Sequence, residues 1–118
     1  MSKIYSSTMD ILRDEINNSD LKSTYNFSID YYLDISTPII EITSFETLSI
    51  DVIINLWTII NNWIQKYHIN LINEFYNDAD NNDNKYPIRI DIYRHNNLSE
   101  MPLHVKVLSS SIDLKSFL

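Results

Sequence analysis

One uninterrupted stretch, Ser49 to Tyr76, constrains the fold of this chain more than any other. It holds both tryptophans and contains neither glycine nor proline. Its apolar residues recur at spacings of three, four and seven, which is the pattern of a helix that buries one face. Ser49 can cap the first turn, where the helix dipole also favours the negative charge of Asp51. We therefore predict a helix over 49–76, with a first half that is apolar almost all round and covered on more than one side.

This predicted helix is long for the size of the chain. Over its full range it would measure about 42 Å at 1.5 Å per residue. A compact domain of 118 residues is expected to be only about 34 Å across. Either the helix ends or bends near 67–70, or its far end projects from the domain. A projecting end would expose apolar side chains and favour a homodimer through Leu71, Ile72, Phe75 and Tyr76.

Four other segments alternate apolar and polar residues with a period of two, which predicts strands with one buried face. They are Tyr25–Leu33, Ile39–Phe45, Ile88–Tyr93 and Leu103–Leu108. The turn at 35–38 favours an antiparallel hairpin of the first two segments. A shorter helix is predicted over 6–19, with Ser7 near its beginning as the cap.

The last predicted strand and the tail complete the order of elements. Alternation predicts that Leu103, Val105 and Val107 point inward and that Leu108 points outward. The tail that follows is predicted to form a short helix capped by Ser111. The resulting order, α-β-β-α-β-β, predicts an α+β fold in a single domain over 1–118. We expect two layers, a four-stranded and mainly antiparallel sheet with helices on one face, so that the other face is wetter.

Composition excludes several classes of function. Sixteen acidic and nine basic residues give a net charge of −7, which argues against nucleic-acid binding because phosphate contacts need clustered lysine and arginine. Cysteine is absent, so disulfides, thiolate metal sites and a cysteine nucleophile are excluded. The N-terminal segment lacks the apolar core of a signal peptide, and no uncharged run is long enough to span a bilayer. We therefore expect a cytoplasmic protein without membrane contact.

Glycine is also absent, so another residue must occupy every position that needs a positive φ angle. Asparagine tolerates the left-handed region better than most residues. We expect asparagine at these positions.

Two metal-site patterns fail on inspection. The segment 78–89 has oxygen-bearing side chains at alternate positions, as a calcium-binding loop does, but Asp83 and Arg89 stand where glycine and a bidentate glutamate are required. A solvated turn is therefore favoured. The histidines have none of the spacings of zinc motifs; they are His68, His95 and His104. The sequence predicts no metal and no cofactor.

The uncovered face of the sheet carries the candidate functional residues. If the alternation holds, one side presents Asp30, Tyr32, Glu41, Thr43, Arg89, Asp91, Tyr93, His104 and Lys106. Residues 23–65 also contain five carboxylates and no basic residue. An acidic surface beside exposed tyrosines suits docking to a basic protein, because charge steers the encounter and aromatic rings supply contact area. We predict binding residues at Asp30, Tyr32, Asp34, Glu41 and Tyr93, although acidity for solubility alone is an equal alternative.

Three functions remain open at this point. The first is a small acidic protein that binds another protein, as a viral or bacterial antagonist, an immunity-type inhibitor or a chaperone-like adaptor. The second is an RNA-cleaving, toxin-like enzyme that uses Arg89, Tyr93, His104 and Lys106 for acid–base chemistry and phosphate stabilisation. For these residues an ordinary solvated face, with an ion pair such as Asp91 with Lys106, is the plainer interpretation. The third is a structural homo-oligomer subunit.

Two resemblances accompany these alternatives. The element order and acidic charge resemble the class I type III secretion chaperones, dimeric α+β proteins that hold effector segments in extended form. Those proteins have a further strand before their long helix. Separately, YRHNNLSEMPLHVKV at 93–107 is similar to a bacterial domain of unknown function with an asparagine turn and a PxHxHV-like strand. Lys106 stands in place of its second histidine. We assign the chain to neither family.

Overall fold

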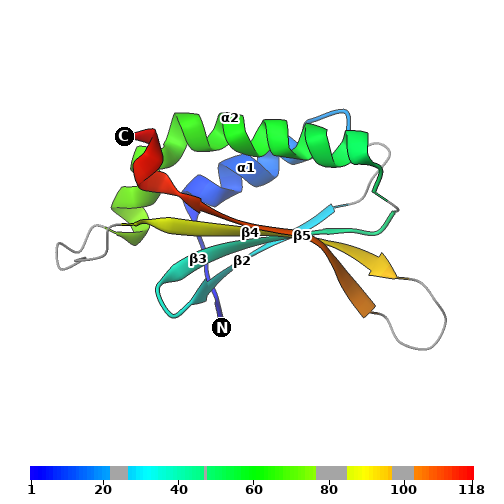
Figure 1. The fold of residues 1–118 in the computed structure, drawn as a ribbon, viewed down its shortest axis with the longest axis horizontal. Coiled ribbons are helices and arrows are strands. Elements are labelled where there is room, and N and C mark those ends of the chain that lie inside the picture. Colours follow the sequence, from blue (N-terminus) through cyan, green and yellow to red (C-terminus); the bar gives the residue numbers. More distant parts are fainter. Residues whose placement is uncertain (22–26, 47, 77–84, 97–102) are drawn as a thin grey trace.

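The computed structural model describes residues 1–21, 27–46, 48–76, 85–96 and 103–118, which form two layers (Figure 1). The elements in chain order are β1 (Ser2–Lys3), α1 (Ser7–Asn17), β2 (Phe27–Asp34), β3 (Thr37–Ser44), α2 (Ile50–Phe75), β4 (Pro87–Asn96), β5 (Leu103–Asp113) and the 3₁₀ helix η1 (Leu114–Phe117). Both α-helices lie on one side of the sheet, and the other side is open (Figure 1). The predicted α+β fold with helices on one face is therefore confirmed.

The sheet differs from the prediction in two details. It has five strands in the order β1-β2-β3-β4-β5, and β3 and β4 are parallel while the other pairs are antiparallel. The predicted sheet had four strands and was mainly antiparallel, and only its first hairpin was specified. Strand β1 contains only two residues, too few to show an alternating pattern. The parallel pair arises because α2 carries the chain back along the whole sheet before β4 begins, as a crossover helix does.

Helix α1 is joined to α2 by packing and by one long-range hydrogen bond. Met9, Leu12 and Ile16 on its inner face are fully buried. The indole Nε1 of Trp63 donates to the carbonyl oxygen of Thr8 at 3.0 Å. The cap of α1 is Ser6, whose hydroxyl accepts from the Met9 amide, and not the predicted Ser7.

Helix α2 runs without a break from Ile50 to Phe75, and Ser49 caps it as predicted. The molecule accommodates its length because it is elongated, with extents of 48 × 29 × 22 Å; the expected width of about 34 Å was too small along the long axis. The sheet and α1 pack against two sides of α2, as predicted, but its first half is not covered all round, since Ile50 and Ile54 are 77% and 55% exposed. The sheet and α1 cover only part of this helix.

The far end of α2 is packed by its own chain and does not project as an apolar arm. Leu71 is completely buried in the core, and Ile72, Phe75 and Tyr76 pack against the core and are partly buried. The Tyr76 ring stacks on Tyr86 with centroids 4.8 Å apart. The argument for a homodimer through these four residues therefore loses its structural basis.

Strand β5 corrects the predicted orientation of its side chains. A register shift between Ile92 and Tyr93 inserts an irregularity into the β4–β5 ladder, and a shift of one residue turns side chains to the opposite face. Leu108, opposite Ile92, consequently packs against the core. Val105 lies before the shift, opposite Arg94, and keeps its predicted side, but both Val105 and Val107 are more than one-third exposed. The strand continues to Asp113, which caps η1 in place of the predicted Ser111.

The tip of the β2–β3 hairpin contradicts the expectation for asparagine. Among the described residues, Ile35 alone has a positive φ angle, 59°. A β-branched residue is an unfavourable choice there because its side chain crowds the backbone. The segment 78–84, which includes most of the calcium-like pattern, lies outside the described residues. Within the described ranges, no helix is long and apolar enough to cross a membrane.

Candidate functional site

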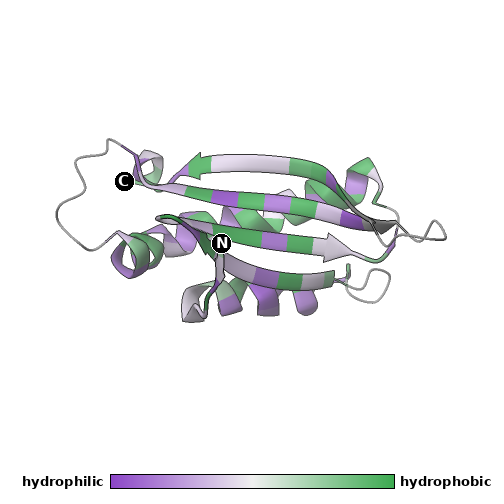
Figure 2. Cartoon of the chain, turned by 90° about the horizontal axis from the view of Figure 1, so that it is seen from below, coloured by the Kyte–Doolittle hydropathy of each residue, from purple (hydrophilic) through white to green (hydrophobic). Residues whose placement is uncertain are grey.

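The open face of the sheet, the side opposite α1 and α2, carries the candidate site. Figure 2 views this face and shows hydrophobic and hydrophilic residues alternating along its strands. The inward residues of β2, β3 and β4 form the core with the two helices. Their neighbours in sequence therefore point to the open side, because successive side chains alternate across a strand.

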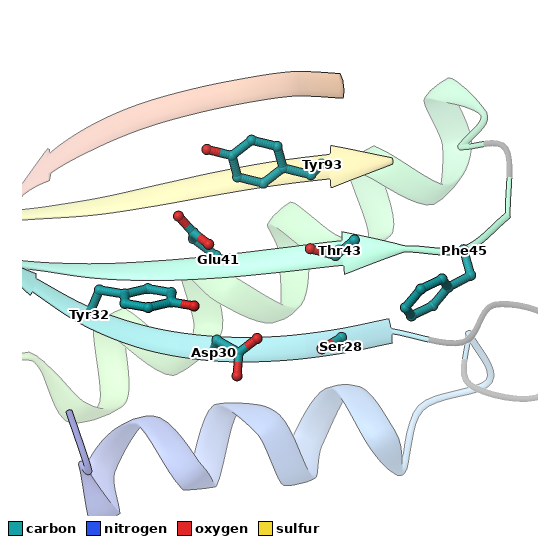
Figure 3. A pocket seen from close by; sticks show the side chains of 7 residues that line it. All are labelled: Ser28, Asp30, Tyr32, Glu41, Thr43, Phe45 and Tyr93. Carbon is teal, nitrogen blue, oxygen red and sulfur yellow. The ribbon is translucent and has the colours of Figure 1, made fainter. Parts of the chain in front are cut away.

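A hollow of about 380 Å³ lies on this face, over the centre of β2, β3 and β4 (Figure 3). Its lining residues are Ser28, Asp30, Tyr32, Glu41, Thr43, Phe45 and Tyr93. Four of the five predicted binding residues are among them. The fifth, Asp34, pairs with Thr37 at the hairpin end of β2 and does not line the hollow.

Three carboxylates form a row across the sheet. Asp30 of β2 is the register partner of Glu41 of β3, and Glu41 is the register partner of Asp91 of β4. Adjacent strands are about 4.8 Å apart, so the middle carboxylate has an acidic neighbour on each side. Like charges at such positions repel each other unless cations or hydrogen bonds compensate.

The outer members of this row are compensated within the chain. Lys3 Nζ lies 3.1 Å from an oxygen of Asp30. Asp91, completely buried, lies 3.2 Å from Arg89 Nε and 3.9 Å from Lys106 Nζ. The Ser109 hydroxyl also donates to Asp91. The predicted ion pair between Asp91 and Lys106 is therefore confirmed.

Glu41, the middle member, has no hydrogen bond or ion pair to any described residue. Figure 3 shows its carboxylate between Tyr32 on β2 and Tyr93 on β4. Burial, followed by repulsion from Asp91 and then Asp30, raises the pKa of Glu41 above its ordinary value. Burial and the neighbouring Asp30 and Glu41 likewise raise the pKa of the Tyr32 phenol.

The Thr43 hydroxyl is another polar group of the hollow without a hydrogen bond to the described part of the chain. Thr43 is only 9% exposed and lines the hollow one step along β3 from Glu41. Its register partners are Ser28 and Tyr93. A buried hydroxyl is ordinarily hydrogen-bonded, so this one is available to a group that enters the hollow.

Aromatic rings form the sides of the hollow. Tyr32 and Tyr93 stand on either side of Glu41, and Phe45 closes one end (Figure 3). The sequence patterns did not single out Phe45 and Ser28. Both lie within the predicted strands, at positions that alternate onto the open face.

The four residues proposed for RNA cleavage are only partly brought together. Lys106 Nζ lies 5.7 Å from the centre of the Tyr93 ring. Both Arg89 and Lys106, however, contact the carboxylate of Asp91, and both also attract the neighbouring Glu41 from a distance. The side chain of His104 lies outside the described residues. No cluster of three or more histidine or acidic side chains among the described residues could hold a metal ion.

Comparisons with protein-family models, with curated proteins and with solved structures found no match.

Proposed function

We propose that the protein acts by binding another protein, one with a basic surface, through the open face of its sheet. The observation that carries this proposal is the composition of the hollow. Its lining contains two carboxylates and three aromatic rings and no basic residue. Aromatic residues are enriched in the contact surfaces of proteins, and complementary charge accelerates and orients association.

The net charge of the chain supports the same proposal. At −7 it attracts cationic partners over distances of about one Debye length, roughly 8–10 Å at physiological salt. An antagonist, an immunity-type inhibitor or a chaperone-like adaptor would each act in this way without catalysis. We further infer a cytoplasmic location, which the absence of cysteine supports.

The test is capture of partners from native lysate by the tagged protein, compared with a Tyr32→Ala/Tyr93→Ala variant. We expect one stoichiometric basic protein that is released as salt rises and is lost with the variant. Tyr5→Ala is the matched control, because Tyr5 is an exposed tyrosine outside the hollow. Equal capture by the wild type and the double variant would refute binding through this face.

Two further measurements separate the alternatives. RNA cleavage by the wild type that disappears in Arg89→Gln, with folding intact, would favour the enzyme. A mass in light scattering that exceeds the monomer and rises with concentration would favour a homo-oligomer. We expect neither result.

A further inference from the structure

We infer that the hollow receives one basic side chain of the partner, an arginine or a lysine, with Glu41 as its counter-charge and the Thr43 hydroxyl as a second acceptor. This inference rests on the protein-binding function proposed above. It adds the chemistry of the group that the hollow recognises and assigns the residues that contact it.

The distribution of charge on the open face selects Glu41. The cations of this face lie at its two sides, Lys3 on Asp30 and the Arg89–Lys106 pair on Asp91. The middle carboxylate lies between two other acids and has no cation in contact among the described residues; Arg89 and Lys106 attract it only from a distance, and burial and repulsion still raise its pKa. A guanidinium or ammonium group placed here would relieve that repulsion, whereas an anion would increase it.

The walls of the hollow also suit a cation. Tyr32 and Tyr93 flank Glu41 (Figure 3), and the faces of aromatic rings attract positive charge within about 6 Å of the ring centre. The Tyr93 ring already has the Lys106 ammonium at 5.7 Å, which shows that a cation is accommodated beside it. An arginine or lysine would pack its apolar stem against these rings while its charged end reaches Glu41.

Thr43 provides an argument independent of the carboxylates. Thr43 as a whole is about nine-tenths buried, it lines the hollow, and its hydroxyl has no partner in the described part of the chain. Guanidinium and ammonium groups carry several N–H donors and no acceptor. Such a group could donate to the Glu41 carboxylate and to Thr43 Oγ1 at once. The volume of about 380 Å³ is near the lower limit for small-ligand sites, which fits the end of one side chain.

The experiment uses N-acetyl-arginine amide as the probe and follows backbone amide shifts of the whole chain by NMR at low salt. The uncharged isostere N-acetyl-citrulline amide is the matched control ligand. We expect saturable shifts around Glu41, Thr43 and Tyr93 with the arginine probe and none with citrulline. Glu41→Gln should lower the affinity for the arginine probe by about tenfold or more, as expected for loss of a charge-assisted hydrogen bond. Thr43→Val should lower the same affinity several-fold.

Glu74→Gln is the control variant, since it removes the same charge from an exposed position on α2; its affinity should stay within about twofold of the wild type. Equal shifts with citrulline, shifts that avoid the hollow, no shifts at all, or unchanged affinity in Glu41→Gln would each overturn the inference. These outcomes are separable from failure of the proposed function. Capture of the partner by Glu41→Gln, with loss of capture in Tyr32→Ala/Tyr93→Ala, would support binding through the open face. It would refute only the recognition of a basic side chain by Glu41.

Discussion

Glu41 on β3 and Asp91 on β4 are direct neighbours in the parallel register of the sheet, yet their carboxylates are in opposite situations. Asp91 is completely buried and is held by Arg89, Lys106 and Ser109. Glu41 faces the hollow without a partner among the described residues. The described part of the sheet therefore provides partners for the carboxylate of Asp91 but none for that of Glu41. Substituting the two acids should change the stability of the protein in opposite directions.

Glu41→Gln is predicted to stabilise the protein at neutral pH. The pKa of Glu41 is raised by burial, by Asp91 and by Asp30. The folded chain therefore binds a proton at Glu41 more tightly than the unfolded chain does. The stabilising effect of this tighter binding is present below the ordinary glutamate pKa of 4.5 and is lost as pH rises through the folded value. In urea unfolding, the variant should have a higher free energy of unfolding than the wild type at pH 7. This difference should disappear near pH 4. A gain that does not change with pH would contradict this origin.

Asp91→Ala is predicted to lower the free energy of unfolding by about 2 kcal/mol, since it strands the Ser109 hydroxyl and two cations. The loss stays below that of a fully buried pair because Arg89 and Lys106 remain partly exposed to water. Asp14→Ala on α1 removes an exposed acid and should change stability by less than about 0.5 kcal/mol. Urea unfolding of both variants checks the prediction, and equal small effects would show that Asp91 is not a structural anchor.

The local patterns of the sequence were sufficient for most of the architecture. Period-two alternation located the four longer strands because each has one face in the core, and the spacing of apolar residues located both α-helices. The same alternation placed Asp30, Glu41 and Tyr93 on one face, where the hollow now brings them together. Ser49 was recognisable as a cap because capping depends only on residues within one turn.

Features that depend on distant geometry could not be predicted in this way. The parallel pairing of β3 and β4 requires knowing that α2 spans the whole sheet, and the bulge that turns Leu108 inward requires the partner strand. The complete burial of Asp91 depends on groups from two strands. Only the assembled sheet shows that no cation in the described part of the chain contacts Glu41.

Leu71→Ala is predicted to cost about 2–5 kcal/mol of stability, because the side chain is completely buried and its removal leaves a cavity. Ile69→Ala, two residues earlier on the same helix, removes a side chain that is 55% exposed and should cost less than about 1 kcal/mol. Thermal unfolding and light scattering of both variants check this. A change of oligomeric mass in Leu71→Ala without loss of stability would restore the role of this helix end in a homodimer.

Ile35→Gly is predicted to stabilise the protein, although it removes an apolar side chain. Ile35 has a φ of 59° and is 94% exposed at the hairpin tip, so its side chain contributes little burial while its backbone lies in the left-handed region. That region costs about 1–2 kcal/mol for a residue with a Cβ atom. Glycine avoids this cost but loses more chain entropy on folding, by about 0.5–1 kcal/mol, so a net gain of about 0.7 kcal/mol is expected. Ser36→Gly, at a neighbouring position without a positive φ, should instead destabilise. Destabilisation by both substitutions in urea unfolding would mean that Ile35 does not strain the turn.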